Sequence, residues 1–237
     1  MIKSLSIIIP FFNEEQRIQS CLKRIAKFNK KISTEFILVN DGSYDRSNFI
    51  VKEFLKKNSK NVKLLNLKKN MGKGHALKKG IQVAKKEWIL TSDLDLSVPL
   101  DQIFNWTKGN YLKKNCYIYF GSRGHKKSIV KANLYRIFLG KIFRFIINIL
   151  FTIEITDTQC GYKLYQKKIA KKIFKKIKMS RFEHDLEIVL NAKKLNQPII
   201  ELPVKWIHKS NSKLNIIIDP IRMFLGILFL KYKWKTF

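Results

Sequence analysis

Four apolar runs recur in the first part of the chain, and each ends in a short polar turn. The runs are Leu5–Ile9, Phe36–Val39, Val62–Leu67 and Trp88–Thr91, and helix-like patterns of apolar residues lie between them. Continuous apolar strands that alternate with helices predict a parallel sheet covered on both faces. Such sheets bind ligands at the carboxyl ends of their strands. The four polar turns are therefore where we expect the functional site.

The rest of the chain extends this α/β pattern without a linker rich in Pro, Gly or Ser. We expect a strand at 117–120, a long helix at 133–152, helices near 167–177 and 183–195, a strand at 199–204 and an amphipathic segment at 216–230. No internal repeat is visible. These features predict one domain over 1–237, with a core over 1–165 and C-terminal helices with a membrane-interface segment over 166–237.

The chain is strongly basic, with 48 Lys and Arg against 17 Asp and Glu and a formal charge of +31. This charge favours polyanionic partners such as nucleic acid, anionic membranes or phosphate-bearing substrates. The lysines are dispersed, and no helix-turn-helix, RRM or zinc-finger string appears, so a nucleic-acid-binding protein is the weaker alternative. Biased coding toward Lys, Ile and Asn would also explain part of the excess.

The cysteines and the apolar stretches indicate in which compartment the protein works. Cys21, Cys116 and Cys160 are widely separated and odd in number, which indicates neither a disulfide framework nor a CxxC metal site and favours a reducing cytosolic setting. We see no signal peptide pattern. The apolar stretches at 137–155 and 223–230 are interrupted or too short for a bilayer span. We therefore expect no transmembrane segment.

Two carboxylates, Asp93 and Asp95, follow the strand that ends at Thr91. Carboxylate oxygens are the ligands that Mg²⁺ and Mn²⁺ prefer, and Mg²⁺ is usually held by one or two protein carboxylates plus substrate phosphates. Acidic pairs are also common as solvated turn residues. By itself the pair leaves both interpretations open.

Two further turns are compatible with a bound nucleotide. The stretch 70–76 opens a helix after a strand, so its backbone amides and Lys73 could meet a diphosphate, although a simple helix-opening turn is equally compatible. It contains neither a Walker loop nor a GxGxxG fingerprint. Asp41 ends the second strand, where it could accept hydrogen bonds from a nucleobase or ribose, or could serve only as a turn residue.

Taken together, these strings resemble the inverting family-two glycosyltransferases with the GT-A fold. The resemblance rests on the order and spacing of Pro10–Glu15, Asn40–Asp45, Asn70–Gly74 with Gly80, and Ser92–Asp95. The string Asp157–Tyr165 is similar to a signature of polyprenyl-phosphate glycosyltransferases. Trp206 and Ser212–Asn215 resemble the dolichyl-phosphate glucosyltransferase branch. The family implies an α/β fold, a three-layer Rossmann-like sheet with C-terminal amphipathic interface helices.

The resemblance also assigns roles to the strand ends. It implies that the nucleoside pocket is lined by Pro10, Phe12, Glu14 and Asp41. Lys73 would approach the diphosphate, Asp93 would serve the donor and the metal, and Asp95 would be the main ligand of Mg²⁺ or Mn²⁺. Three residues depart from the family pattern, namely Phe12 in place of Tyr, Asn40 in place of Asp and Lys69 in place of Arg.

The acceptor decides which further groups are needed. A sugar hydroxyl requires a base, whereas a phosphate monoester has a second pKa near 6 and is largely dianionic at neutral pH, so it needs cations. Guanidinium groups bind phosphate bidentately, which favours Arg123, Arg136 and Arg144. Asp157 is the first candidate for a base or for orienting the acceptor, and Asp185 the second. We expect Glu187 to support Asp185.

The function implied by the resemblance is metal-dependent, inverting transfer of a hexose to a polyprenyl phosphate, with UDP-glucose as the expected donor. The alternative within the family is transfer to a glycan or another hydroxyl acceptor. Basic residues beside large apolar ones at 133–152 and near the C-terminus suit a bilayer interface, although such stripes are usually buried core. We predict a peripheral protein at the cytoplasmic face of a membrane and leave the oligomeric state open.

Overall fold

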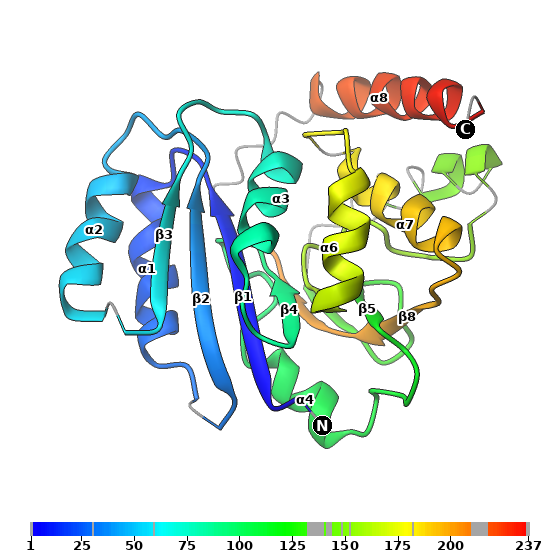
Figure 1. Cartoon of the computed structure of the whole chain (residues 1–237). Helices are drawn as coiled ribbons and strands as arrows, with labels where there is room; N and C mark the ends of the chain where they lie inside the picture. Colours follow the sequence, from blue (N-terminus) through cyan, green and yellow to red (C-terminus); the bar gives the residue numbers. More distant parts are fainter. Residues whose placement is uncertain are drawn as a thin grey trace.

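A mixed seven-stranded sheet forms the centre of the computed structural model (Figure 1), with strand order β3-β2-β1-β4-β7-β5-β8. Its strands are β1 (Ser4–Phe11), β2 (Ser33–Asn40), β3 (Val62–Asn66), β4 (Trp88–Thr91), β5 (Ile118–Ser122), β7 (Lys163–Gln166) and β8 (Ile199–Pro203). The structure describes all residues except 1, 30, 59, 132–139, 141–143, 148, 152, 182, 210–217 and 236–237. The first four strands are parallel, as the apolar runs predict.

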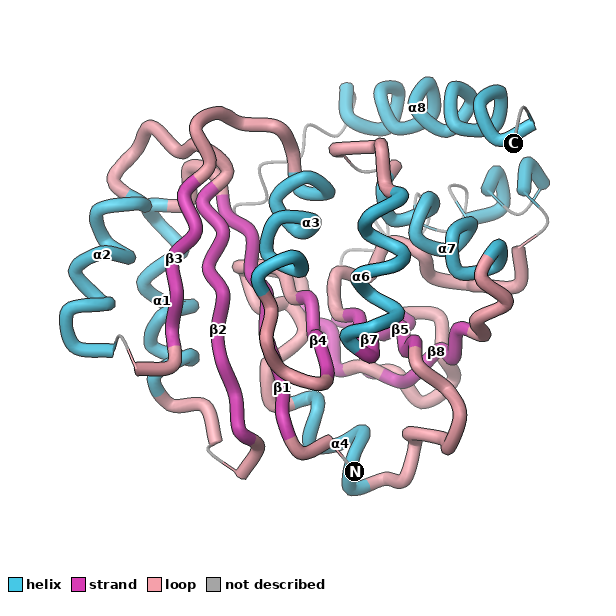
Figure 2. The backbone as a smooth tube through the Cα atoms, viewed as in Figure 1, coloured by secondary structure: helices cyan, strands magenta, loops and turns pink. Residues whose placement is uncertain are grey.

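Helices cover both faces of this sheet, as Figure 2 shows. They are α1 (Glu15–Ala26), α2 (Ser47–Asn58), α3 (Lys73–Val83), α4 (Gln102–Lys108), α6 (Lys167–Lys176), α7 (His184–Lys194) and α8 (Ile218–Lys235). Side chains alternate between the faces of a strand, and in β1 Leu5, Ile7 and Ile9 pack with α1 and α4, whereas Ile8 packs with α3. The result is the expected three-layer fold with a core on each side of the sheet.

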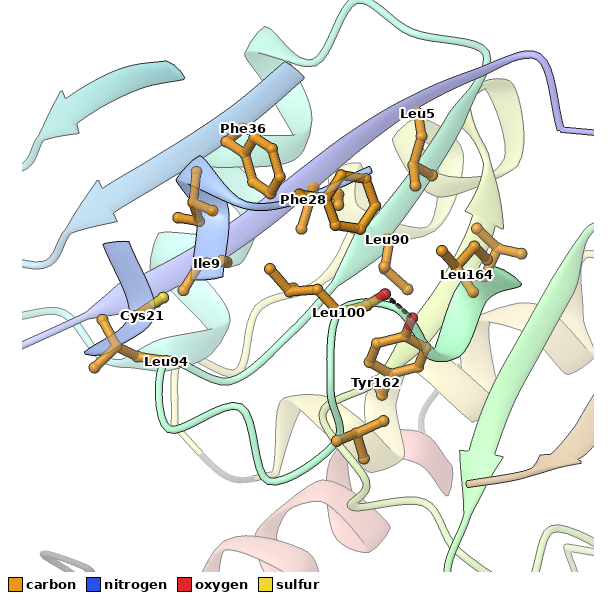
Figure 3. Close-up of a cluster of buried hydrophobic side chains, with 14 of the residues drawn as sticks. Leu5, Ile9, Cys21, Phe28, Phe36, Leu90, Leu94, Leu100, Tyr162 and Leu164 are labelled. Atoms are coloured by element: carbon orange, nitrogen blue, oxygen red, sulfur yellow. Dashed lines mark hydrogen bonds between the residues drawn. The ribbon is translucent and has the colours of Figure 1, made fainter. Parts of the chain in front are cut away.

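The core on the α1 and α4 side fixes the loop that follows β4. Figure 3 shows Leu5, Ile9, Leu90 and Leu94 in this cluster, together with Tyr162, whose hydroxyl donates a hydrogen bond of 3.0 Å to the carbonyl of Leu100. Leu94 is buried between the two carboxylates of the acidic pair. Its burial turns Asp93 and Asp95 to the outside of the loop.

The strand β7 makes the sheet mixed, which the parallel sheet predicted from the first four strands did not include. It lies between β4 and β5 and is antiparallel to both. The sequence did not identify it as a strand because it contains Lys163 and follows a polar segment. The hydroxyl of Thr91 donates to the carbonyl of Gly161 at 2.9 Å. This contact brings the segment at 157–161 beside the end of β4.

Other elements were also missed, namely α4 and the small sheet of β6 (Ile129–Lys131) with β9 (Lys205–Ile207). The helix expected at 133–152 lies partly outside the described residues, and the parts at 140, 144–147 and 149–151 are helical. The C-terminal segment forms α8, which begins two residues after the predicted start and continues beyond its end. No helix within the described parts of the chain is both long and apolar enough to cross a membrane.

Candidate active site

The acidic pair lies at the carboxyl end of β4. The Asp93 side chain is 41% exposed, and one of its oxygens lies 2.5 Å from Nζ of Lys73. One oxygen of Asp95 accepts a hydrogen bond of 2.9 Å from the backbone N–H of Ser97, which orients this carboxylate. The pair therefore presents oxygens from one rigid loop toward solvent.

These two residues fit a divalent ion that is shared with a substrate. The described residues contain no group of three or more His, Cys, Asp or Glu side chains placed to hold a metal by themselves. A hard ion held by one or two carboxylates completes its shell with phosphate oxygens and water. Half-exposed carboxylates at a strand end suit that arrangement, in which Asp95 and Asp93 would be the ligands.

Lys73 lies in the first turn of α3, between two glycines that approach other segments closely. Gly72 has a φ of +98°, and a Cβ there would lie 2.4 Å from the carbonyl oxygen of Ser180. The N–H of Gly74 donates to the same carbonyl at 2.8 Å. Burial would lower the pKa of Lys73, but the charges of Asp93 and Asp185 raise it above its ordinary value. Lys73 is therefore a fixed cation beside the acidic pair.

Asp41 holds the loop that carries Lys73. Its buried carboxylate accepts hydrogen bonds from the backbone N–H groups of Met71, at 3.1 Å, and Gly72, at 2.7 Å. Burial raises its pKa despite these hydrogen bonds. A carboxylate has further acceptor capacity, so its predicted contact with the nucleoside stays a prediction.

The end of β1 places the remaining residues of the predicted nucleoside pocket. Pro10 lies within β1, and the ring of Phe12 packs edge-on against Tyr44 at 5.8 Å between centroids. Glu14 forms a two-hydrogen-bond ion pair with Arg17 on the first turn of α1. Tyr44 is 86% exposed and had no predicted role. The structure therefore brings an aromatic pair to this end of the sheet.

Arg123 and Asp157 form an ion pair at the end of β5. Nε and one terminal nitrogen of Arg123 donate to the two oxygens of Asp157 at 2.7 and 2.8 Å, and the N–H of Arg123 adds a third bond of 2.8 Å. Glu201 accepts the N–H of Asp157 at 2.9 Å. The guanidinium also lies 5.7 Å from the ring of Trp206. Arg123 is thus held on two sides at the end of β5.

The pKa of Asp157 helps to choose between its two predicted roles, that of a base and that of a residue that orients the acceptor. Burial would raise its pKa, but Arg123, with a smaller effect from Arg144, lowers it. A carboxyl group with a lowered pKa is a weak base. The geometry therefore favours the orienting role of Asp157, through Arg123. Arg136, another predicted phosphate ligand, lies outside the described residues.

Asp185 lies on α7 and contacts Lys163 of β7. Both side chains are nearly inaccessible, with exposed fractions of 8% for Asp185 and 2% for Lys163. The ammonium also lies 4.7 Å from the ring of Phe120. Sequence reasoning missed Lys163, although it stands among the apolar residues of the signature string. The predicted support of Asp185 by Glu187 was wrong, since Glu187 instead accepts the backbone N–H groups of Lys178 and Met179.

The segment at 157–161, which begins the signature string, connects the Arg123–Asp157 pair with the Lys73–Asp93 pair. Asp157 at its start binds Arg123, whereas Gly161 at its end packs on Asp93, where a Cβ would lie 2.2 Å from a carboxylate oxygen. Replacing Gly161 with Ala should displace the Asp93 carboxylate from Lys73. We expect about tenfold weaker binding of UDP with Mn²⁺, comparable to one lost charge-assisted hydrogen bond, measured by calorimetry.

Gly140→Ala is the matched control for this change, because no atom of the described residues lies within 4 Å of a Cβ at Gly140. The control should bind UDP like the wild type. Equal binding by both variants would show that the close packing of Gly161 on Asp93 does not matter for the donor.

The pKa of Asp185 predicts that the stability of the protein depends on pH. Burial would raise its pKa, but the neighbouring His184, Lys163 and Lys73 lower it from 3.8 to about 2. The carboxylate therefore stabilises the fold fully above about pH 5, and this contribution is lost as the pH falls toward 2, at about 1.4 kcal/mol per pKa unit. Urea unfolding at pH 5 and pH 3 should show a smaller loss for Asp185→Asn than for the wild type. Equal losses would contradict the assignment.

Comparison with known proteins shows the family to which the chain is similar. Residues 6–174 match the family model described as glycosyl transferase family 2. Dolichyl-phosphate beta-glucosyltransferase of Dictyostelium discoideum is 34% identical, over 97% of this chain and 74% of its own length. The human protein of the same name is 32% identical, over 99% of this chain and 76% of its own length.

Solved structures share the fold at low sequence identity. Glucosyl-3-phosphoglycerate synthase from Mycobacterium tuberculosis, solved with Mn²⁺, UDP-glucose and phosphoglyceric acid, superposes with a TM-score of 0.72 at 15% identity, over 97% of this chain and 79% of that one. The TarS fragment of S. aureus gives a TM-score of 0.56 at 21% identity, over 84% of this chain and 58% of that one. The chain therefore belongs to glycosyl transferase family 2 and is a glycosyltransferase with the GT-A fold.

Proposed function

We propose that the protein transfers glucose from UDP-glucose to a polyprenyl phosphate, with inversion at the anomeric carbon. The observation that carries this proposal is the Arg123 guanidinium, which donates two hydrogen bonds to Asp157 while the backbone N–H of Arg123 donates a third. A fixed cation with a weakly basic partner suits a phosphate acceptor better than a hydroxyl, because the phosphate is already ionised. The relatives named dolichyl-phosphate beta-glucosyltransferase support the same acceptor and sugar.

The donor would bind across the ends of β1, β2 and β4. Phe12, Pro10, Glu14 and Asp41 would hold the nucleoside, and Lys73 would face the diphosphate. Asp95 and Asp93 would hold Mg²⁺ or Mn²⁺, which supplies Lewis-acid stabilisation of the leaving diphosphate. Structures of the mycobacterial synthase with UDP contain Mn²⁺ or Mg²⁺, which supports a divalent ion.

The acceptor phosphate would bind on the opposite side of the sugar. Arg123 would bind its oxygens through the guanidinium edge that Asp157 leaves free, with Arg136 and Arg144 as further cations. Arg144 lies close to this position, since a Cβ at Gly124 would meet its guanidinium at 2.8 Å. Asp157 would orient Arg123. An approach opposite to the leaving diphosphate gives inversion.

Two helical surfaces suit attachment to a membrane. Phe145 and Ile149, which lie in the helical parts at 144–147 and 149–151, are 66% and 63% exposed. On α8 the exposed apolar residues include Leu225 and Phe229, whereas Ile227 and Leu230 on its other side are buried in the core. Exposed apolar groups beside basic residues favour an interfacial position. We place the protein peripherally at the cytoplasmic face, where the active site would meet a lipid phosphate.

The test is an assay of the purified protein with radiolabelled UDP-glucose, GDP-mannose and UDP-N-acetylglucosamine in the presence of Mn²⁺. Each donor is paired with a polyprenyl phosphate or with soluble sugars. We expect labelled product in the organic phase with UDP-glucose and the lipid acceptor. Product that stays in water would instead indicate a hydroxyl acceptor, and the absence of transfer from every donor would reject the proposed function.

A further inference from the structure

A partly buried cluster of charges lies at the predicted diphosphate site. Asp93 pairs with Lys73 and Asp185 pairs with Lys163, and the charge of Asp185 also acts on Lys73. The outer pair, Lys73 with Asp93, is partly accessible, whereas the inner pair is nearly inaccessible. This pairing matters because a buried charge without a partner is strongly destabilising. Each lysine therefore depends on a neighbouring carboxylate.

The inner carboxylate is poorly placed to act as a base. Asp185 contacts the ammonium of Lys163, and Nε2 of His184 lies 3.4 Å from the same Asp185 oxygen. His184 is fully buried, and burial favours its neutral form. The positive charges that balance Asp185 are therefore those of Lys163 and Lys73, and Lys73 belongs to the predicted donor site. Asp185 is therefore placed to hold a neighbouring cation in position.

The backbone around Asp185 also fixes the turn that bears Lys73. A Cβ at Gly74 would lie 2.7 Å from Cβ of His184, the residue before Asp185. The carbonyl of Ser180 accepts the N–H of Gly74 at 2.8 Å. The start of α7 and the segment before it therefore pack directly on the first turn of α3. A change at this end of α7 acts on Lys73 by contact as well as by charge.

Donor binding would change the partners of Lys73. In the structure its ammonium is paired with Asp93, and these are the two groups that the proposed function assigns to the diphosphate and the metal. When Asp93 turns to the donor, Lys73 loses this counter-charge and needs another that stays in place. The buried carboxylate of Asp185 is held by Lys163 and so remains available.

We propose that Asp185 is a positioning residue for the donor, which keeps Lys73 directed at the diphosphate while Asp93 exchanges partners. Lys163 is the buried counter-ion that holds Asp185. This inference rests on the proposed use of a nucleoside diphosphate donor and replaces the role of Asp185 as a second candidate base. Without Asp185, Lys73 stays on Asp93 and competes with the metal for that carboxylate.

The test measures the affinities of UDP and uridine, in the presence of Mn²⁺, and thermal stability for three variants. Asp185→Asn should bind UDP at least tenfold more weakly and uridine like the wild type, because uridine lacks the diphosphate. Lys163→Met should lower the melting temperature and weaken UDP binding less than Asp185→Asn does, because Asp185 keeps its charge but loses the partner that holds it. The double variant should be more stable than Asp185→Asn and still bind UDP weakly.

Glu35→Gln is the matched control, because Glu35 is a buried carboxylate paired with Lys63 at the other end of β2. It should lose stability without losing UDP affinity. If UDP affinity fell in proportion to thermal stability across all variants, Asp185 would have only a structural role. Equal or tighter UDP binding by Asp185→Asn would also overturn the inference. A wild-type protein that binds neither UDP nor uridine would reject the proposed function itself.

Discussion

Asp95→Asn should lower kcat/KM for sugar transfer by about a thousandfold, the largest effect that we expect from a single substitution. The carboxylate is held toward the donor side by the N–H of Ser97, and the change removes a negative ligand from the predicted Mg²⁺ or Mn²⁺ site. Stabilisation of a leaving group by a metal amounts to several kcal/mol, and each 1.36 kcal/mol changes the rate by about tenfold. Steady-state kinetics at saturating Mn²⁺ measures the loss.

Binding provides a second readout for this variant. Calorimetry should show that Mn²⁺ no longer strengthens the binding of UDP to Asp95→Asn, whereas uridine binds as before. Asp101→Asn is the control, because Asp101 is an exposed carboxylate at the start of α4. It should match the wild type in both assays. Retained enhancement by Mn²⁺ in Asp95→Asn would reject Asp95 as a metal ligand.

Arg123→Lys should lower kcat/KM for the polyprenyl phosphate by about a hundredfold. A lysine keeps the positive charge but cannot bind Asp157 and a phosphate through one planar fork. Hydrogen bonds to charged groups contribute about 1.5–3 kcal/mol, which corresponds to roughly 10- to 150-fold. The loss should appear with the lipid acceptor, whereas the affinity for UDP should stay unchanged. Kinetics with varied lipid phosphate and calorimetry with UDP separate the two effects.

The control for this change is Arg24→Lys, which makes the same replacement at an exposed position on α1. Its activity should equal that of the wild type. Arg123→Ala would be a poorer test, because it leaves Asp157 buried without its main partner, at a cost of about 3–5 kcal/mol. If Arg123→Lys loses affinity for UDP and not for the acceptor, Arg123 belongs to the donor site instead.

Much of the fold was predictable because the sequence carries it locally. The runs that form β1, β2, β3 and β4 are apolar and end in turn residues, and their order along the chain gave the parallel half of the sheet. β7 was not predictable in this way. Its short length and Lys163 conceal it. It is a strand because it pairs with β4 and β5, and Asp185 and the ring of Phe120 accommodate the buried ammonium of Lys163.

The candidate site was also predictable only in part. The acidic pair, Lys73 and Arg123 were predicted as site residues from their positions at strand or helix ends, which local sequence patterns reveal. Their partners were not identified. Asp157 lies 34 residues from Arg123, and Glu187 was assigned to Asp185 from sequence proximity but instead binds the backbone at 178–179. Local patterns carry no information about which distant side chain completes a pair.

The sequence by itself therefore determined the strand–helix alternation and which chemical groups stand at the carboxyl ends of the strands. Only the tertiary structure decided how those groups are paired: Lys73 with Asp93, Arg123 with Asp157 and Lys163 with Asp185. The physical reason is that the strength of an ion pair depends on distance and burial. Both quantities are set by the packing of segments that are far apart in the chain.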